Sequence, residues 1–152
     1  MGETTGFLER PDGARIAWRR VDGAGPTVVW LGGFRSDMAG TKAQALADWA
    51  LTRGQAYVRF DYFGHGESSG DFAEGTITRW REDALAVLTE LATGEVVLVG
   101  SSMGGWISCL AAPAMGERLK ALVLIAPAPD FTEKLMAPEM TTADRAELDA
   151  TG

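Results

Sequence analysis

One short stretch of this sequence has the residue types and spacing of a nucleophilic site. Gly100-x-Ser102-x-Gly104 follows an apolar run and precedes a helical pattern, the context expected for a serine on a sharp turn between a strand and a helix. The glycines are needed because neighbouring backbones must approach such a turn closely, where a Cβ atom would collide. The turn exposes the serine hydroxyl and directs the positive end of a helix at developing negative charge. We therefore predict that Ser102 attacks an acyl group.

An acyl-transfer serine also requires hydrogen-bond donors for the oxyanion that forms on the attacked carbonyl group. In this arrangement one donor is the N–H of the residue after the serine, here Met103, and the other comes from a loop after an earlier strand. Leu31-Gly32-Gly33-Phe34 ends an apolar run and fits that loop. We predict that the backbone N–H groups of Phe34 and Met103 form the oxyanion hole.

A second match to the same pattern provides an internal comparison. Gly66-Glu67-Ser68-Ser69-Gly70 follows a glycine-rich turn and no helical pattern begins after it, so Ser68 is predicted to be a loop residue.

Cys109 is the only cysteine, and we interpret it as a buried apolar residue rather than a nucleophile. No group of His, Cys or carboxylate residues has the spacing of a metal site, so no metal is expected.

These motifs need elements that hold them in place, and the apolar pattern predicts six strands and three helices. A hairpin is expected around Pro11-Asp12-Gly13. The predicted strands are 6–10, 14–20, 27–31, 57–61, 96–99 and 120–126. The predicted helices run from Thr41 to Arg53, from an N-cap at Thr78 to about Gly94, and from Ser102 to about Met115. Strands that alternate with helices are typical of a mainly parallel α/β sheet. Four tryptophans are expected in the core: Trp30, Trp49, Trp80 and Trp106.

The composition is that of one folded domain, with 152 residues, 46% of them hydrophobic and 23% charged. The formal net charge of −7 argues against a general nucleic-acid binder, which needs a basic surface to displace phosphate counterions. The first residues lack the pattern of a secretory signal peptide, and no apolar run reaches 18 residues. We therefore predict a cytoplasmic protein without a membrane span.

In their order along the chain, these motifs resemble those of the α/β-hydrolase superfamily. The resemblance covers residues 6–135 and includes the hairpin, the loop ending at Phe34, and Ser102 in GSSMGG. It also includes the stretch from Asp61 to Ser68, which looks like the family's D-x-x-G-x-G-x-S turn. The stretch from Trp30 to Asp61 is most similar to acyl-protein thioesterases and acyl-glucuronide esterases of mitochondria and their bacterial relatives. The resemblance implies a three-layer α/β-hydrolase fold and cofactor-free hydrolysis of a small acyl ester or thioester through an acyl-enzyme.

The family's mechanism also requires an acid and a histidine, in the chain order serine, acid, histidine. No histidine follows Ser102, because His65 is the only one in the sequence. We interpret His65 as a structural residue of its turn. Asp130 follows the last predicted strand, where a minority of the superfamily places the acid, and it stays open as a candidate.

The resemblance implies an eight-stranded sheet, of which the sequence provides six strands. We therefore interpret residues 1–152 as the N-terminal part of one α/β-hydrolase domain, truncated before the later strands. Its core would cover about residues 6–126, and residues 127–152 would begin a cap or linker. The strand at 120–126 would then have an unpaired apolar edge, which favours self-association. The acidic residues from Glu139 to Asp149 are expected to form a solvated face.

Two alternatives remain open at this point. An aminopeptidase of the proline-iminopeptidase kind uses the same serine turn, and the sequence shows no specificity pocket that separates the two activities. A short non-catalytic protein that binds a partner is the alternative from outside the enzymes. The acyl chain and the leaving group are not defined by these motifs.

Overall fold

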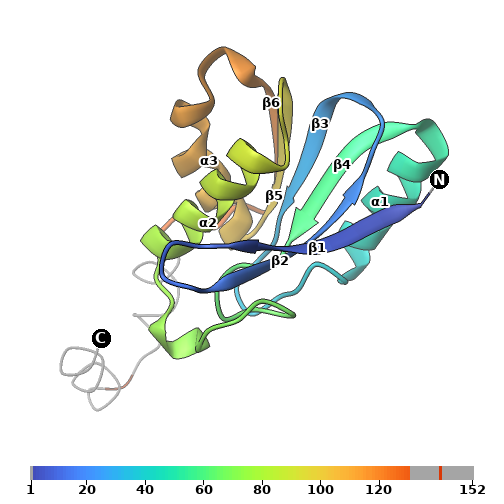
Figure 1. Cartoon of the computed structure of the whole chain (residues 1–152). Helices are drawn as coiled ribbons and strands as arrows, with labels where there is room; N and C mark the ends of the chain where they lie inside the picture. Colours follow the sequence, from blue (N-terminus) through green and yellow to red (C-terminus); the bar gives the residue numbers. More distant parts are fainter. Residues whose placement is uncertain (1, 131–140, 142–152) are drawn as a thin grey trace.

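The computed structural model of this chain describes residues 2–130 and residue 141. The strands are β1 (Glu3–Glu9), β2 (Arg15–Val21), β3 (Ala24–Leu31), β4 (Gln55–Phe60), β5 (Val96–Ser101) and β6 (Leu119–Ile125) (Figure 1). The α-helices are α1 (Thr41–Arg53), α2 (Ile77–Glu90) and α3 (Met103–Met115), with 3-10 turns at Phe72–Glu74 and Gly116–Arg118. The predicted order of strands and helices is confirmed for this part of the chain. The expected cap or linker beyond residue 130 and the expected acidic face lie outside the described residues.

The strands form one mixed sheet in the order β1-β2-β4-β3-β5-β6. The hairpin β1–β2 is antiparallel and pairs antiparallel with β4, whereas β4, β3, β5 and β6 run parallel to one another. Because parallel strands point the same way, their carboxyl ends meet at one edge of the sheet. In open α/β sheets, ligands bind in the crevice outside this edge. The segments that follow β3, β4 and β5 therefore converge there.

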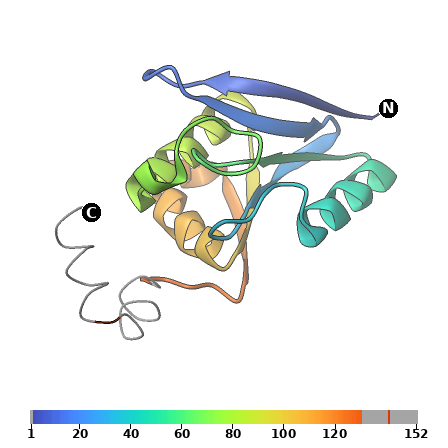
Figure 2. The same cartoon turned by 90° about the horizontal axis from the view of Figure 1, so that it is seen from below.

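Helices cover both faces of the sheet and give the three layers expected of an α/β-hydrolase fold. Helix α1 packs on one face, and α2 and α3 pack on the other, as the end-on view shows (Figure 2). Alternate side chains of β3 separate the two cores: Val28 and Trp30 pack with α1, whereas Val29 and Leu31 pack beneath α2 and α3. This alternation follows from the two-residue period of a strand.

The predicted limits of helix α1 are confirmed, whereas those of helix α2 differ from the structure at both ends. Helix α1 has the predicted limits, and Gly54 follows it with φ 65°, a left-handed conformation that glycine adopts without strain. Helix α2 begins two residues earlier than predicted, because the Thr76 hydroxyl, rather than that of Thr78, accepts the Arg79 N–H at 3.0 Å. The helix also ends at Glu90, and Gly94 lies in the turn beyond it. Either threonine fits the general preference for an N-cap residue, so residue type alone did not locate the start of the helix.

Two burial predictions were wrong. Trp30 and Trp80 are buried as predicted and Trp106 is half-buried, but Trp49 is 39% exposed. Helix α1 meets the sheet through small side chains, Ala43, Ala47 and Ala50, and Trp49 lies beside that narrow face. Cys109 is also exposed rather than buried, because α3 turns the neighbouring residues Ile107 and Ser108 inward.

β6 forms one edge of the described sheet, and no strand of the described residues pairs with its far side. Leu122, Val123 and Leu124 are consecutive in this strand and are 37%, 45% and 39% exposed. An apolar groove of about 440 Å³ lies between α1 and the neighbouring strands, with Trp49 and Val123 on its two sides. The predicted unpaired apolar edge is therefore present in the described part of the chain.

Candidate active site

Ser102 occupies the single residue between the end of β5 and the start of α3. Its backbone has φ 55° and ψ −118°, a region that a residue with a Cβ atom adopts only at an energetic cost. Serine at this position often caps a helix through its hydroxyl group, but the Ser102 side chain makes no such bond. The residue is exposed, so the strained turn presents the hydroxyl group to a ligand instead of using it to stabilise the helix.

The glycines on either side of Ser102 allow the close packing that the sequence predicted. A Cβ atom on Gly104 would lie 1.9 Å from the Leu31 carbonyl oxygen, and one on Gly100 would lie 2.4 Å from the Gly104 oxygen. Both contacts are to backbone, which cannot rotate away as a side chain can. The first turn of α3 is thus packed directly against the ends of β3 and β5, and this packing determines where Ser102 lies.

Hydrogen bonds to the segment of β6 fix the Ser102 backbone further. The Ser102 N–H donates to the Ile125 oxygen at 3.0 Å, and the Ser102 oxygen accepts the Ala128 N–H at 3.1 Å and the Gly105 N–H at 2.9 Å. These bonds come from both sides of the turn. They hold Ser102 in its strained conformation, because a strained residue persists only where its surroundings over-determine it.

A cavity of about 400 Å³ opens beside Ser102 at the carboxyl edge of the sheet. It is lined by Trp30, Gly33, Phe34, Ser36, Asp37, Gly40, Thr41, Lys42, Ala43, Ser101 and Ser102. The loop after β3 and the start of α1 thus form one wall, and the serine turn forms the other. The sequence pattern found Ser102 and Phe34, but it missed the polar wall from Ser36 to Lys42, whose only sequence signal is its place after the glycine loop.

Of the two predicted oxyanion donors, Phe34 lines this cavity, whereas Met103 is buried directly after Ser102. Met103 is the first residue of α3, so its N–H is among those for which the helix itself provides no acceptor. Phe34 follows Gly33 in the opposite wall, and a Cβ atom on Gly33 would lie 3.6 Å from the Ser102 Cβ. The chain therefore brings the Phe34 loop next to Ser102 across 68 positions of sequence, as a two-donor site requires.

His65 does not line the cavity of Ser102. It is 3% exposed, and both ring nitrogens have backbone partners: Nδ1 lies 3.0 Å from the Phe63 oxygen, and Nε2 accepts the Arg35 N–H at 3.2 Å. Burial lowers the pKa of His65 below its usual value, with the Phe63 bond acting in the opposite direction. The ring is thus neutral near pH 7, and both of its nitrogens are hydrogen-bonded to backbone. This agrees with its interpretation as a structural residue.

Ser68, the serine of the second Gly-x-Ser-x-Gly match, is also occupied by the fold. Its hydroxyl group donates to the Asp61 oxygen at 2.6 Å and accepts the Ala17 N–H at 2.8 Å. Asp61 itself accepts the N–H groups of Met38 and Glu67 through its carboxylate, and burial raises the pKa of this carboxyl group. The turn after β4 is therefore a hydrogen-bonded support for the loop after β3, as the loop prediction for Ser68 requires.

Asp130, the residue left open as the acid, is exposed and has φ 50°. It lies two residues beyond Ala128, whose N–H bonds to Ser102. Its side chain does not line the Ser102 cavity. Asp130 thus lies beyond the carboxyl end of β6, and the structure assigns it no partner among the described residues.

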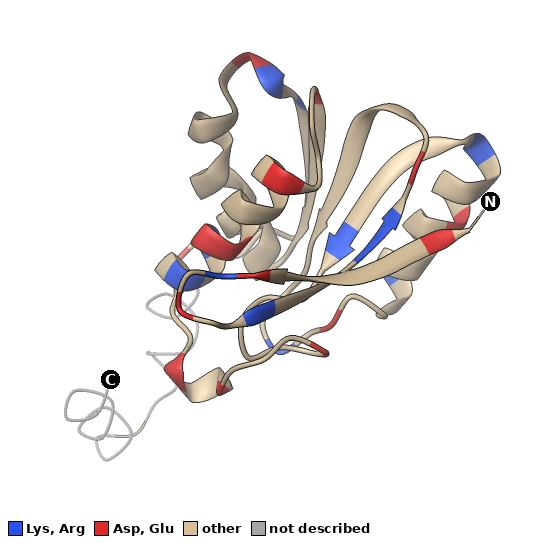
Figure 3. Ribbon diagram, viewed as in Figure 1, with Lys and Arg blue, Asp and Glu red and all other residues tan. Residues whose placement is uncertain are grey.

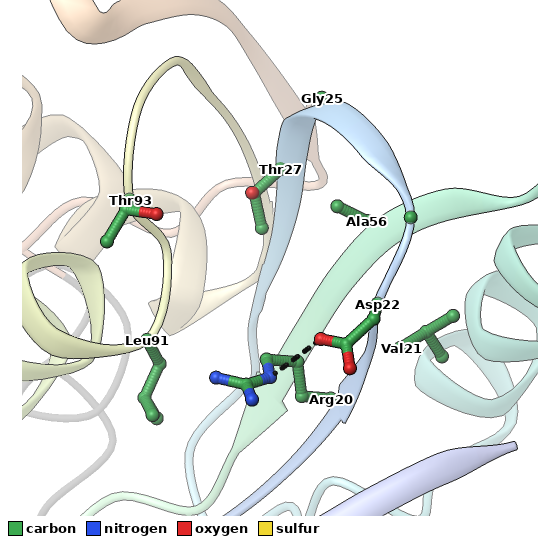
Figure 4. A pocket seen from close by; sticks show the side chains of 9 residues that line it. Arg20, Val21, Asp22, Gly25, Thr27, Ala56, Leu91 and Thr93 are labelled. Atoms are coloured by element: carbon green, nitrogen blue, oxygen red, sulfur yellow. Dashed lines mark ion pairs between the residues drawn. The ribbon is translucent and has the colours of Figure 1, made fainter.

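The remaining features carry no comparable chemistry. A second cavity of about 350 Å³ lies at the opposite, amino edge of the sheet. Its lining includes Arg20 and Asp22, which form an ion pair (Figure 4). Acidic and basic residues are scattered over the described elements (Figure 3). Among the described residues, no three His, Cys, Asp or Glu side chains are placed to share a metal ion. The described helices are too short or too polar to cross a lipid bilayer.

Comparisons with known proteins agree with this geometry. The family model described as serine aminopeptidase, S33 (Hydrolase_4), matches residues 26–147. The palmitoyl-protein thioesterase ABHD10, mitochondrial, of Bos taurus is 44% identical over 124 residues, covering 82% of this chain and 40% of the relative. The human protein of the same name is 42% identical, with the same coverage. This chain thus spans about two fifths of the length of these curated relatives.

Solved structures give the same result for the fold. A structure from Agrobacterium vitis S4 described as a hydrolase superposes with a TM-score of 0.89 at 43% identity, covering 100% of this chain and 63% of the other. Mouse alpha/beta hydrolase domain-containing protein 10 gives a TM-score of 0.86 at 37% identity, covering 98% of this chain and 59% of the other. The resemblance noted from the sequence is therefore confirmed at the level of the superfamily and its thioesterase relatives.

The predicted cytoplasmic location is contradicted by the same comparisons, because the thioesterase relatives are named as mitochondrial proteins. The error has a physical reason. Targeting receptors read leader segments, whereas the composition of a folded domain is similar in either compartment. The absence of a secretory pattern therefore gave no ground for choosing the cytoplasm.

Proposed function

We propose that this chain, which belongs to the serine aminopeptidase S33 family of the α/β hydrolases, provides the nucleophile and the oxyanion hole of a serine hydrolase for esters or thioesters. The observation that carries the proposal is the conformation of Ser102. The residue is strained and exposed, its hydroxyl group does not cap the helix, and it opens onto a cavity at the carboxyl edge of the sheet. A purely structural serine at this position would use its hydroxyl group to cap α3.

In the proposed reaction, the Ser102 Oγ attacks the carbonyl carbon of the acyl group while its proton passes to a base. The carbonyl electrons move to the oxygen, which the N–H groups of Phe34 and Met103 then stabilise together with the positive end of α3. Collapse of this intermediate expels the alcohol or thiol with a proton and leaves the acyl group on Ser102. Loss of one such donor typically slows an enzyme about 100- to 1000-fold.

The base needs separate consideration. No histidine follows Ser102 in these 152 residues, and both nitrogens of His65 are bonded to backbone. We therefore assign to this chain the binding of the acyl group and the nucleophile. Efficient turnover would need a histidine from outside this sequence, since an unassisted serine hydroxyl is a weak nucleophile.

The names of the relatives support a thioester as substrate, since five of them are called palmitoyl-protein thioesterases. The family model is described as that of a serine aminopeptidase, so peptide cleavage is kept as the second candidate. Both reactions use the same nucleophile and oxyanion donors.

Labelling with a fluorophosphonate tests the nucleophile directly, because the Ser102 Oγ would bond to phosphorus and expel fluoride. We expect slow, stoichiometric labelling of the wild-type chain at Ser102 and none in Ser102→Ala. Ser68→Ala is the matched control, since it removes the serine of the other Gly-x-Ser-x-Gly match and should label as the wild type does. Labelling that persists in Ser102→Ala, or is absent from the folded wild-type chain, contradicts the proposal and favours the non-catalytic alternative.

We also propose that the chain self-associates through β6. Three consecutive apolar side chains are exposed on this edge strand, and an unpaired edge of this kind accepts another strand. Val123→Lys places a charge on the edge and should shift the chain toward monomer in light scattering, whereas Leu51→Lys, at an exposed apolar position on α1, should not. A wild-type chain that is monomeric at high micromolar concentration contradicts this proposal.

A further inference from the structure

The loop after β3 carries the proposed oxyanion donor Phe34 and has little regular structure of its own. A tight turn holds it, in which the Ser36 N–H donates to the Gly33 oxygen at 3.2 Å. Arg35, inside this turn, has φ 59°, a left-handed conformation that a residue with a side chain adopts rarely. Something outside the loop must therefore hold it, since strained residues relax unless their surroundings prevent it.

The support comes from the segment after β4. The Tyr62 hydroxyl group donates to the Gly32 oxygen at 3.1 Å, and the Met38 N–H donates to the Asp61 carboxylate at 2.7 Å. These two bonds hold the beginning and the end of the loop. Between them, His65 Nε2 accepts the N–H of Arg35 at 3.2 Å, and Arg35 is the residue directly after Phe34. Of the three bonds from the segment after β4, the His65 bond is thus the one nearest to the proposed oxyanion donor.

The His65 ring is itself held by its surroundings. Its Nδ1 lies 3.0 Å from the Phe63 oxygen, so Nδ1 carries the proton and Nε2 is free to accept. The ring also packs edge-to-face against Tyr62, Phe72 and Trp80, with ring centres 5.1 to 5.5 Å apart. Phe34 packs against Phe72 at 5.0 Å in the same cluster. One aromatic cluster, buried at His65 and half-buried at Phe34, therefore contains both the residue that carries the proposed donor and the ring that holds its neighbour.

We propose that His65 is a positioning residue of the oxyanion hole: by accepting the Arg35 N–H, its Nε2 fixes the Phe34–Arg35 peptide, which directly follows the Gly33–Phe34 peptide that carries the proposed donor. This inference rests on the proposed function of Ser102 and adds a role for the one histidine of the chain. His65 acts through Phe34 and neither touches substrate nor takes a proton from Ser102. The Arg35 backbone needs an acceptor at this position, and a hydrophobic ring of the same size would leave its N–H unsatisfied.

Three variants separate positioning from general stability. His65→Leu fills most of the volume but offers no acceptor, His65→Gln offers an oxygen near the position of Nε2, and Ser68→Ala removes hydrogen bonds from the same turn without changing the Arg35 contact. The probe is a fluorophosphonate, and the readout is the labelling rate at saturating concentration, with the melting temperature measured for each variant. We expect His65→Leu to label at least about 100-fold more slowly, His65→Gln to recover most of the rate, and Ser68→Ala to label normally despite a lower melting temperature.

Exchange of the backbone amide protons of Phe34 and Arg35 gives a second readout that does not depend on reaction at Ser102. We expect protection of the Arg35 amide in the wild type and in His65→Gln, and its loss in His65→Leu. The ring ¹⁵N shifts of the wild type should show a proton on Nδ1 and none on Nε2, a measurement that remains decisive even where His65→Leu does not fold.

The outcomes distinguish this inference from the proposed function. Normal labelling of a folded His65→Leu chain overturns the positioning role and leaves the nucleophile intact. Absence of labelling in the wild type removes the proposed function, and the amide exchange then decides whether His65 holds the loop. A wild-type ring with its proton on Nε2 overturns the inference in either case.

Discussion

The contact of Gly104 with Leu31 gives the sharpest prediction, because it links the packing of α3 to the position of Ser102, the proposed nucleophile. In Gly104→Ala, the new Cβ atom would lie 1.9 Å from the Leu31 oxygen and 2.6 Å from the Gly32 oxygen, where real contacts of this kind are at least 3.0 Å. The first turn of α3 and the end of β3 must therefore separate by at least about 1 Å. That movement displaces Ser102 from the loop that carries Phe34.

The adjacent residue provides a control with the same chemistry. In Gly105→Ala, the new Cβ atom would lie 2.8 Å from the Cβ and 3.0 Å from the Cα of Pro127, a milder overlap than the one with Leu31. Both substitutions gain the same helix propensity, about 1 kcal/mol, so their difference isolates the contact with Leu31. Overpacking typically costs about 1–3 kcal/mol, and a contact with backbone belongs at the upper end.

We therefore expect Gly104→Ala to be less stable than Gly105→Ala by about 2–3 kcal/mol in chemical denaturation. For a chain of this length this corresponds to a difference in melting temperature of about 4–12 °C. A displacement of about 1 Å also lowers a reaction rate roughly 100-fold. We therefore expect a fluorophosphonate to label Ser102 much more slowly in Gly104→Ala than in Gly105→Ala. Equal stability and equal labelling of the two variants would refute the packing argument.

Two further predictions concern residues that the fold uses in ways the sequence pattern did not define. Thr76→Ala should cost about 1 kcal/mol, the usual effect of a lost N-cap, because the Thr76 hydroxyl accepts the Arg79 N–H. Thr78→Ala, inside the first turn, should change the denaturation midpoint little, and the reverse order would show that the N-cap is misplaced. His65 should make the free energy of unfolding fall as the pH drops below about 6.5: its pKa is lowered in the folded state, so the unfolded chain binds the proton first. His65→Gln should lack this fall when urea unfolding is measured from pH 7 to pH 5, and an identical pH profile for the two chains would contradict the burial of a neutral ring.

The sequence by itself determined those features that depend on local order along the chain. The serine turn was predictable because Gly100, Ser102 and Gly104 lie between an apolar strand and a helical pattern, and the close contacts of both glycines bear out the reason for that spacing. The limits of α1 were predictable as well, because Gly54 is the kind of residue that ends a helix. Residue periodicity also gave the order of strands and helices, since it reports which side of each element is buried.

Tertiary structure decided everything that depends on which segments meet. The N-cap of α2 was predicted at Thr78, and the structure places it at Thr76, whose hydroxyl group accepts the Arg79 N–H. Trp49 has the periodicity of a core residue, but the sheet contacts α1 through its alanines and leaves Trp49 at the side. Periodicity defines a face of a helix, whereas the neighbouring layer decides how much of that face is covered.

The role of His65 shows the same division at the candidate site. The sequence placed His65 in a glycine-rich turn and predicted that it is a structural residue of that turn. Its partner Arg35 lies 30 positions earlier, and no local pattern connects the two residues. They meet because β3 and β4 are parallel neighbours whose carboxyl ends share one edge of the sheet. Local spacing therefore predicted the serine turn, whereas the topology of the sheet decided what surrounds Ser102.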